Sequence, residues 1–246
     1  MSDCKLDFTE NVFLYYIICL YIVYIIYFVV VLLFNSNFKK SLVTKKIVSF
    51  FFSITLFYAS YSKYSSNEKP ILIKKLNSRY FFSTLFVCFL LPCFCKNDCF
   101  FALLFTAICS LYAFSRVNEI FIAFICDARD QLSPQSNSSG LLYYERIKLA
   151  MVSYVELILL YGILQFVLSI YHCGIENNNC PITNIWDAIY FSGITIATIG
   201  YGDLVPKHSF SQFLAIYEVI NGFVLIVVSF TVYVSRSISE GEHKVK

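Results

Sequence analysis

Long uninterrupted apolar stretches dominate this sequence and restrict the folds that it can adopt. Crossing a bilayer as a helix takes about 20 mostly apolar residues, with every backbone polar group hydrogen-bonded inside the span. The first stretch, Val12–Phe34, is long enough by itself. Charged residues make up only 14% of the chain, against roughly 25% in a soluble domain. The sequence therefore predicts a multi-pass integral membrane protein.

Six stretches are predicted to cross the membrane as helices. They are Val12–Phe34, Ile47–Tyr61, Tyr80–Cys95, Cys99–Ser115, Leu149–Tyr171 and Ser211–Val234. A seventh apolar stretch, Ile185–Ile199, is too short to span and is predicted to enter the membrane only half-way. The expected fold is all-α.

The segment after this half-membrane helix carries the most informative pattern. Gly200 and Gly202 can adopt the positive-φ conformations that turn successive carbonyl groups toward one side. Four such strands around one axis would replace the water shell of K⁺ with oxygen ligands. The predicted ligands are Thr198, Ile199, Gly200 and Tyr201, with Gly202 completing the filter. The sequence contains one such segment, so a pore requires four chains and we expect a homotetramer.

The run Thr198–Asp203 resembles the Thr-Val/Ile-Gly-Tyr-Gly-Asp signature of the potassium-channel superfamily. The resemblance implies passive, K⁺-selective conduction, because Tyr201 is retained between the two glycines. It also implies a supporting contact between the pore helix and Asp203. Many relatives use Trp as the donor of this contact, whereas Tyr190 occupies the position here.

The pore helix is predicted to begin near Ile185, capped by Thr183 or Asn184, and to end near Ala197. At 1.5 Å per residue it would be roughly 20 Å long. Its carboxyl end would point at the membrane centre, where four partial negative charges would stabilise a cation.

Two residues of the sixth span are predicted to act on the pore. Gly222 falls where related channels carry a hinge glycine, and is either a bending point for the gate or a close helix contact. Glu218 is expected to hydrogen-bond behind the pore helix, near Ser192 or Thr195, rather than to bind ions directly. Glu156, in the fifth span, is a further intramembrane carboxylate to which the sequence assigns no specific role.

The domain organisation follows from these assignments. We expect a four-span peripheral region (1–126), a cytoplasmic linker (127–148), a pore domain (149–235) and a short cytoplasmic tail (236–246). The linker prediction rests on the Ser-, Asn-, Pro- and Gly-rich composition of residues 127–140. Val117–Cys126 is either an extension of the fourth helix or an interfacial helix.

Basic residues lie mostly in loops predicted to be inside, which agrees with positive-inside bias. Lys39, Lys40, Lys45 and Lys46 would lie outside, so a five-span topology with the second stretch on the inner surface stays open. Cys173 and Cys180 bracket a short loop and either form a disulfide or are packing thiols.

A strong voltage sensor requires several charges that move through the field. The fourth span carries only Arg116, which is expected to extend to the cytoplasmic interface. We therefore predict weak voltage gating or none.

Other function classes find little support. The net charge of +3 does not suggest nucleic-acid binding, and the three histidines lack neighbours that indicate catalysis or a metal site. The expected protein is a plasma-membrane potassium channel subunit in contact with lipids, without a cofactor apart from permeant K⁺. The alternatives are a regulatory subunit, or a receptor or scaffold, that keeps the pore fold without conducting alone.

Overall fold

The computed structural model describes Thr55 and residues 69–94, 100–132, 140–171, 174–177, 180–231 and 234. The first predicted span, the second apart from Thr55, and the predicted tail lie outside these residues. Four of the described helices are long and apolar enough to cross a membrane. The chain is an integral membrane protein, as its composition predicts.

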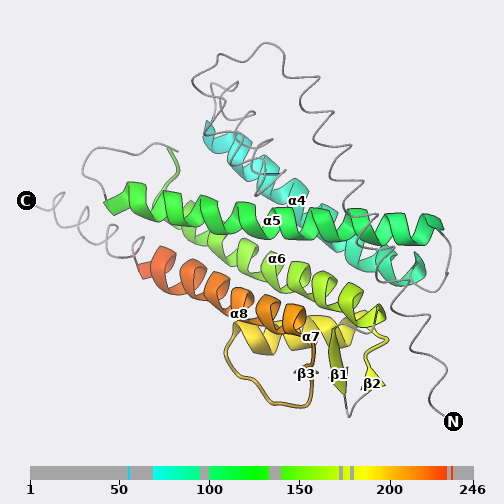
Figure 1. Cartoon of the computed structure of the whole chain (residues 1–246). Coiled ribbons are helices and arrows are strands. Elements are labelled where there is room, and N and C mark those ends of the chain that lie inside the picture. The colour runs from blue at the N-terminus through cyan, green and yellow to red at the C-terminus, as the bar shows by residue number, and fades with distance from the viewer. Residues whose placement is uncertain are drawn as a thin grey trace, which may run out of the picture.

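The described elements are mainly helical (Figure 1). The helices are α4 (Lys69–Phe94), α5 (Phe100–Leu132), α6 (Tyr143–Ile170), α7 (Ile185–Ile196) and α8 (Ser209–Phe223), and α8 continues as the π-helix η1 (Val224–Phe230). The strands are β1 (Ile175–Asn177), β2 (Cys180–Pro181) and β3 (Val205–Pro206).

Several helices extend beyond the apolar stretches that predicted them. α4 begins at Lys69 rather than Tyr80, and α6 begins at Tyr143 rather than Leu149. α5 continues through Val117–Cys126 to Leu132, so this segment is an extension of the fourth helix and the helix enters the predicted linker. At 1.5 Å per residue α5 is about 50 Å long, well beyond a ~30 Å hydrocarbon core. Apolar composition marks the part of a helix in lipid, whereas backbone hydrogen bonding continues past it.

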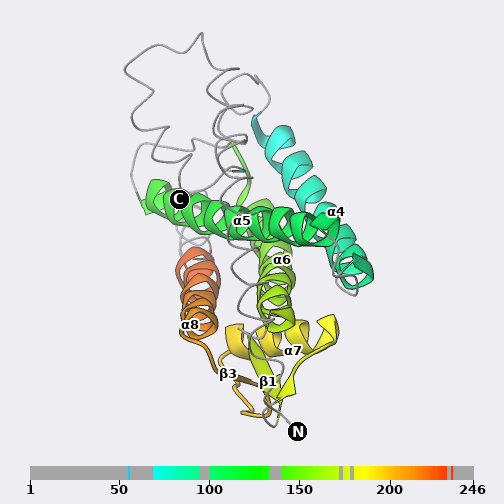
Figure 2. The same cartoon turned by 45° about the vertical axis from the view of Figure 1, so that its right-hand side comes forward.

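Helix α6 forms the centre of the described structure. It packs against α4, α5, α7 and α8, and Leu157, Leu160 and Ile163 are fully buried along it. Figures 1 and 2 show α8 running alongside α6, with α7 at the end of α6 next to the small sheet. The predicted pore helix, α7, is thereby positioned by α6 and α8 together.

The sheet lies beside the predicted filter. Its order is β2-β1-β3, and both pairings are antiparallel. Ile175 pairs with Pro206 and Glu176 with Val205, so the chain just after Asp203 is tied to the α6–α7 connection. Strands of two or three residues are too short to show alternation, which is why the sequence did not predict them. Cys173 lies outside the described residues, so both alternatives for Cys173 and Cys180, a disulfide or packing thiols, stay predictions.

The close packing of α6 on α7 generates a stability prediction. A Cβ added at Gly162 would lie 2.8 Å from Ile189 Cγ1, whereas one at Gly193 would meet only Ile158 Cγ2 at 3.9 Å. We expect Gly162→Ala to lower the free energy of unfolding by about 1–3 kcal/mol through overpacking. Gly193→Ala should be neutral or stabilising by up to about 1 kcal/mol. Thermal unfolding of the detergent-purified variants measures both, and equal effects would contradict the observed packing.

Candidate ion-conducting site

The pore helix α7 begins where a side-chain cap is available. Asn184 has extended backbone angles (φ −115°, ψ 131°), and its side-chain oxygen accepts a hydrogen bond of 3.1 Å from the Trp186 N–H. Of the two predicted caps, the structure uses Asn184. Asp187 lies in the first turn, where a negative charge is favourable. The 12 residues of α7 span about 18 Å, close to the predicted length.

The filter backbone alternates between two conformations. Thr198, Gly200 and Gly202 have positive φ values of 58°, 56° and 79°, while Ile199 and Tyr201 between them do not. Alternation of left- and right-handed residues turns successive N–H groups to one side. The positive φ values of the two glycines confirm the sequence prediction. Thr198 was not predicted to share them, because this conformation is strained in a β-branched residue, at a cost of roughly 1–3 kcal/mol.

The N–H side of the filter faces α7. Thr198 N–H donates to Thr195 O at 2.9 Å, and Ile199 N–H donates to Ile194 O at 2.8 Å. Gly200 N–H shares the Ile194 carbonyl at 3.3 Å. The last turn of the pore helix therefore fixes the first filter residues, and their own carbonyls are left for other partners.

The rest of the filter is open in the isolated chain. The side chains of Ile199 and Tyr201 are 54% and 69% exposed. A Cβ added at Gly200 or Gly202 would meet nothing within 4 Å, so both positions need glycine for their positive φ rather than for space. This segment is held only on its α7 side. Other groups are therefore needed to complete its surroundings.

Two contacts link the filter region to its supports. The Tyr190 hydroxyl lies close to the Asp203 carboxylate, which brings α7 next to the residue that follows the predicted filter. Behind α7, the Ser192 hydroxyl donates to Glu218 Oε1 of α8. Ser192 and Glu218 are both fully buried, so this bond lies inside the protein. Of the two partners predicted for Glu218, Ser192 and Thr195, the structure uses Ser192.

Gly222 allows α8 to approach the end of α7. A Cβ there would lie 2.6 Å from Ile196 Cγ1 and 3.2 Å from the Ile196 carbonyl oxygen. This geometry supports the close-contact interpretation of Gly222. The π-helix η1 begins two residues later, at Val224, and a widened turn of this kind is often found at functional sites. The hinge role of Gly222 stays a prediction.

Gln165 and Ser211 form a reciprocal pair between α6 and α8 that the sequence did not predict. Gln165 Nε2 donates to Ser211 O at 3.1 Å, and Ser211 Oγ donates to Gln165 Oε1 at 2.6 Å. Both are polar residues within predicted spans, and such residues usually face protein partners. That tendency could have singled them out, but not which partner each would find.

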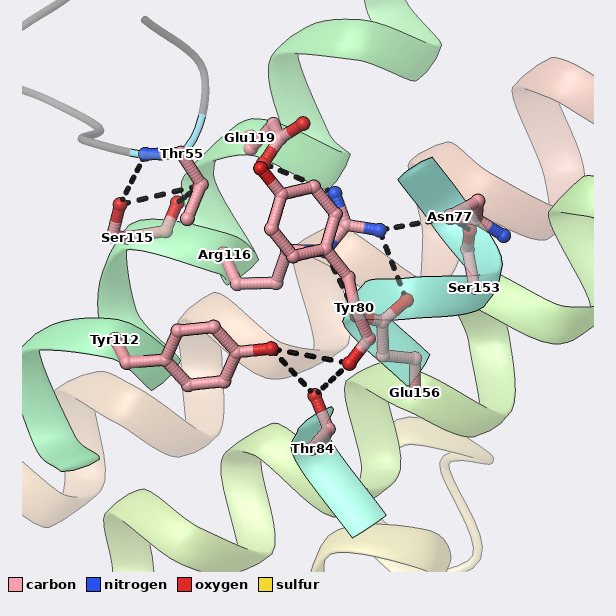
Figure 3. A network of polar contacts seen from close by, with 10 residues as sticks. All are labelled: Thr55, Asn77, Tyr80, Thr84, Tyr112, Ser115, Arg116, Glu119, Ser153 and Glu156. Atoms are coloured by element: carbon pink, nitrogen blue, oxygen red, sulfur yellow. Dashed lines mark hydrogen bonds and ion pairs between the residues drawn. The ribbon is translucent and has the colours of Figure 1, made fainter. Parts of the chain in front are cut away.

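Arg116 does not extend to the cytoplasmic interface, so that prediction was wrong. It is only 4% exposed, and its guanidinium donates to Glu156 Oε1 at 2.8 Å and Oε2 at 3.1 Å (Figure 3). It also donates to Asn77 Oδ1 at 2.8 Å and forms an ion pair of 3.0 Å with Glu119. The guanidinium carbon lies 4.2 Å from the centre of the Tyr80 ring.

Burial of Arg116 is possible because acceptors from three helices surround it. The contact also gives Glu156 a role, as the partner in α6 that holds α5. The opposite charges of Arg116 and Glu156, in two predicted spans, could have indicated this pair. The pair was missed because Arg116 was assigned to the inner end of its span.

Comparison with known proteins agrees with this geometry. Residues 156–238 match the family model described as ion channel. The match covers the described part of α6 from Glu156 onward, α7, the filter and α8. This segment is therefore similar to an ion-channel module.

Three curated relatives are potassium channels by name. The chain is 32% identical over 71 residues to a hyperpolarization-activated voltage-gated potassium channel of Methanocaldococcus jannaschii. It is 48% identical over 44 residues to two-pore potassium channel 1 of Arabidopsis thaliana, and 34% over 74 residues to two pore potassium channel a of Oryza sativa subsp. japonica.

These similarities are local. They cover 29%, 18% and 30% of this chain, and 32%, 12% and 21% of the respective relatives. The chain thus aligns with a third or less of each relative. No solved structure shows significant similarity to it.

The buried Ser192–Glu218 bond generates a second stability prediction. Ser192→Ala would leave Glu218 Oε1 buried without its donor, which should cost about 1–3 kcal/mol of unfolding free energy. The same substitution at Ser83, exposed on α4, should change stability by no more than about 0.5 kcal/mol. Thermal unfolding of the two variants in detergent measures the difference in stability. Indistinguishable midpoints for the two variants would show that the Ser192–Glu218 bond contributes nothing.

Proposed function

We propose that this chain is a subunit of a potassium-selective channel that conducts K⁺ passively. The observation that carries the proposal is the alternating backbone of Thr198–Gly202, whose first N–H groups are bonded to α7. In this proposal the successive carbonyls face the side of the backbone away from α7. The proposed K⁺ ligands are the carbonyls of Thr198, Ile199, Gly200 and Tyr201, acting in place of the hydration shell.

A homotetramer would complete the site. One chain has one filter strand, and a ring of carbonyls needs several. α8 presents an apolar stripe whose members recur every three or four residues, as expected for one helix face. Phe213, Ile216, Ile220 and Phe223 are 53%, 62%, 45% and 58% exposed. We propose that this stripe and Tyr201 contact neighbouring subunits or line the pore.

The supporting residues have distinct proposed roles. Tyr190 holds Asp203, and thus the outer end of the filter. Glu218 holds Ser192 in the middle of the pore helix. Gly222 is the proposed bending point of the inner helix, below which η1 could move relative to α7.

Weak voltage dependence is supported by the surroundings of Arg116. The single guanidinium lies with two carboxylates, Glu119 and Glu156, so this cluster carries no net positive charge when all three are ionised. A charge moved across the whole membrane gains about 2.3 kcal/mol per 100 mV, and Arg116 is bonded to a neighbouring helix. We propose that the channel resides in the plasma membrane and opens with little dependence on voltage.

The filter assignment predicts the effect of two substitutions. Gly200→Ala adds a Cβ at a φ of 56°, and Tyr201→Ala removes the side chain at the adjacent position. We expect both variants to lose K⁺-selective flux while still forming tetramers. The measurement is Rb⁺ and Na⁺ uptake into liposomes by purified protein, with Ser83→Ala as a control that retains wild-type flux.

Unchanged exclusion of Na⁺ in both filter variants would contradict the filter assignment. Absence of Rb⁺ uptake by wild-type tetramers would instead favour the alternative of a subunit that does not conduct alone.

Voltage gating can be tested separately. If Arg116 does not move through the field, the open probability should change less than about tenfold over 100 mV. Recordings of single channels in planar bilayers give this slope directly. A steep dependence, abolished by Arg116→Gln, would show that Arg116 senses voltage.

A further inference from the structure

A short polar segment crosses the apolar part of α5. Arg116, Asn118 and Glu119 are 4%, 6% and 5% exposed, although α5 is long and apolar enough to span a membrane. Polar groups at such positions are costly unless they face protein partners. The contacts of this segment therefore show which helices are linked to α5 and would be affected by its movement.

The two sides of the segment hold different helices. Arg116 bonds to Glu156 of α6 and Asn77 of α4. Asn118 is two residues later, about 200° around the helix at 100° per residue. Its side-chain oxygen accepts a hydrogen bond of 2.7 Å from the Tyr217 hydroxyl of α8. α5 is thus bonded to the peripheral and outer helices on one side and to the inner helix on the other.

Tyr217 occupies a packed position in α8. Its ring lies 6.1 Å from the Phe213 ring in a stacked arrangement, and 5.8 Å from the Phe121 ring, edge to face. Its backbone carbonyl accepts a 2.8 Å bond from Asn221 Nδ2, which also donates to the Tyr161 hydroxyl of α6 at 3.0 Å. The Tyr217 ring is therefore held on several sides, and its hydroxyl has a defined direction.

The hydrogen bond to Asn118 is made by the turn of α8 that also contacts the pore helix. Glu218, the next residue, accepts the hydrogen bond from Ser192 of the pore helix. Gly222 and η1 follow within the next turns. A displacement of α5 would therefore act on α8 next to both the filter support and the proposed bending point.

We propose that the Asn118–Tyr217 hydrogen bond couples the position of α5 to the open–closed equilibrium of the inner helix. The inference rests on the proposed channel function and adds a positioning role for two residues. It requires no moving charge in α5, so any stimulus that displaces α5 would reach the pore through this bond.

A double-mutant cycle tests the coupling. Tyr217→Phe removes one hydroxyl and keeps the ring contacts, and Asn118→Leu removes its acceptor. Each should change the open-to-closed ratio of the purified full-length channel in planar bilayers by about threefold to tenfold. The double variant should show no more than either single change, because both remove the same bond. The K⁺/Na⁺ reversal potential should stay at its wild-type value.

Tyr112→Phe is the matched control. The Tyr112 hydroxyl also bonds between two helices, donating to Tyr80 O at 3.1 Å, but it joins α5 only to α4. This variant should leave the open-to-closed ratio unchanged. An equal effect of Tyr112→Phe, an unchanged ratio in Tyr217→Phe, or independent effects that multiply in the double variant would each overturn the proposal.

A second readout does not depend on conduction. Amide hydrogen exchange over residues 209–223 should be faster in Tyr217→Phe and Asn118→Leu, and unchanged in Tyr112→Phe. If wild-type protein passes no K⁺, the proposed function fails, whereas this exchange pattern still decides whether the bond positions α8. Equal exchange in all variants would reject the positioning role.

Discussion

The pore module depends on which side of the Thr198–Gly200 backbone carries the N–H groups. These groups are bonded to the carbonyls of Ile194 and Thr195 in the last turn of α7. The proposed channel function requires the carbonyls of the same segment to face away from α7. The other supports act on this arrangement from a distance. Asn184 fixes the start of α7, Ser192 is held by Glu218, and the sheet ties the segment after Asp203 to the α6–α7 connection.

The helices outside this module are joined to it by a few buried polar contacts. In lipid, apolar surfaces gain little from burying one another, so hydrogen bonds and close packing decide which helices associate. Arg116 with Glu156 and Gln165 with Ser211 fix α5 and α8 on α6. Gly162 of α6 and Gly222 of α8 let their helices approach α7 closely. These contacts add to the buried apolar cluster around α6, which includes Leu157, Leu160 and Ile163.

The sequence predicted the local features of the site and missed the contacts between spans. Capping predicted the start of α7 at Ile185, and glycine conformation predicted the positive φ of Gly200 and Gly202. The need of the buried Glu218 carboxylate for a hydrogen-bond donor predicted its bond behind the pore helix, where Ser192 is the donor. Arg116 was misplaced because its environment depends on how α4, α5 and α6 pack, which apolar patterns do not encode. The strain at Thr198 and the π-helix after Gly222 are likewise products of tertiary context.

In the proposed channel, the carbonyl groups of Thr198–Tyr201 replace the water around K⁺ and not around Na⁺. The most direct test is the reversal potential of purified wild-type protein in a planar bilayer with K⁺ on one side and Na⁺ on the other. We expect a large potential, negative on the K⁺ side, because K⁺ alone flows down its gradient. A current that reverses near zero would show that the two ions permeate equally, and would rule out a K⁺-selective filter.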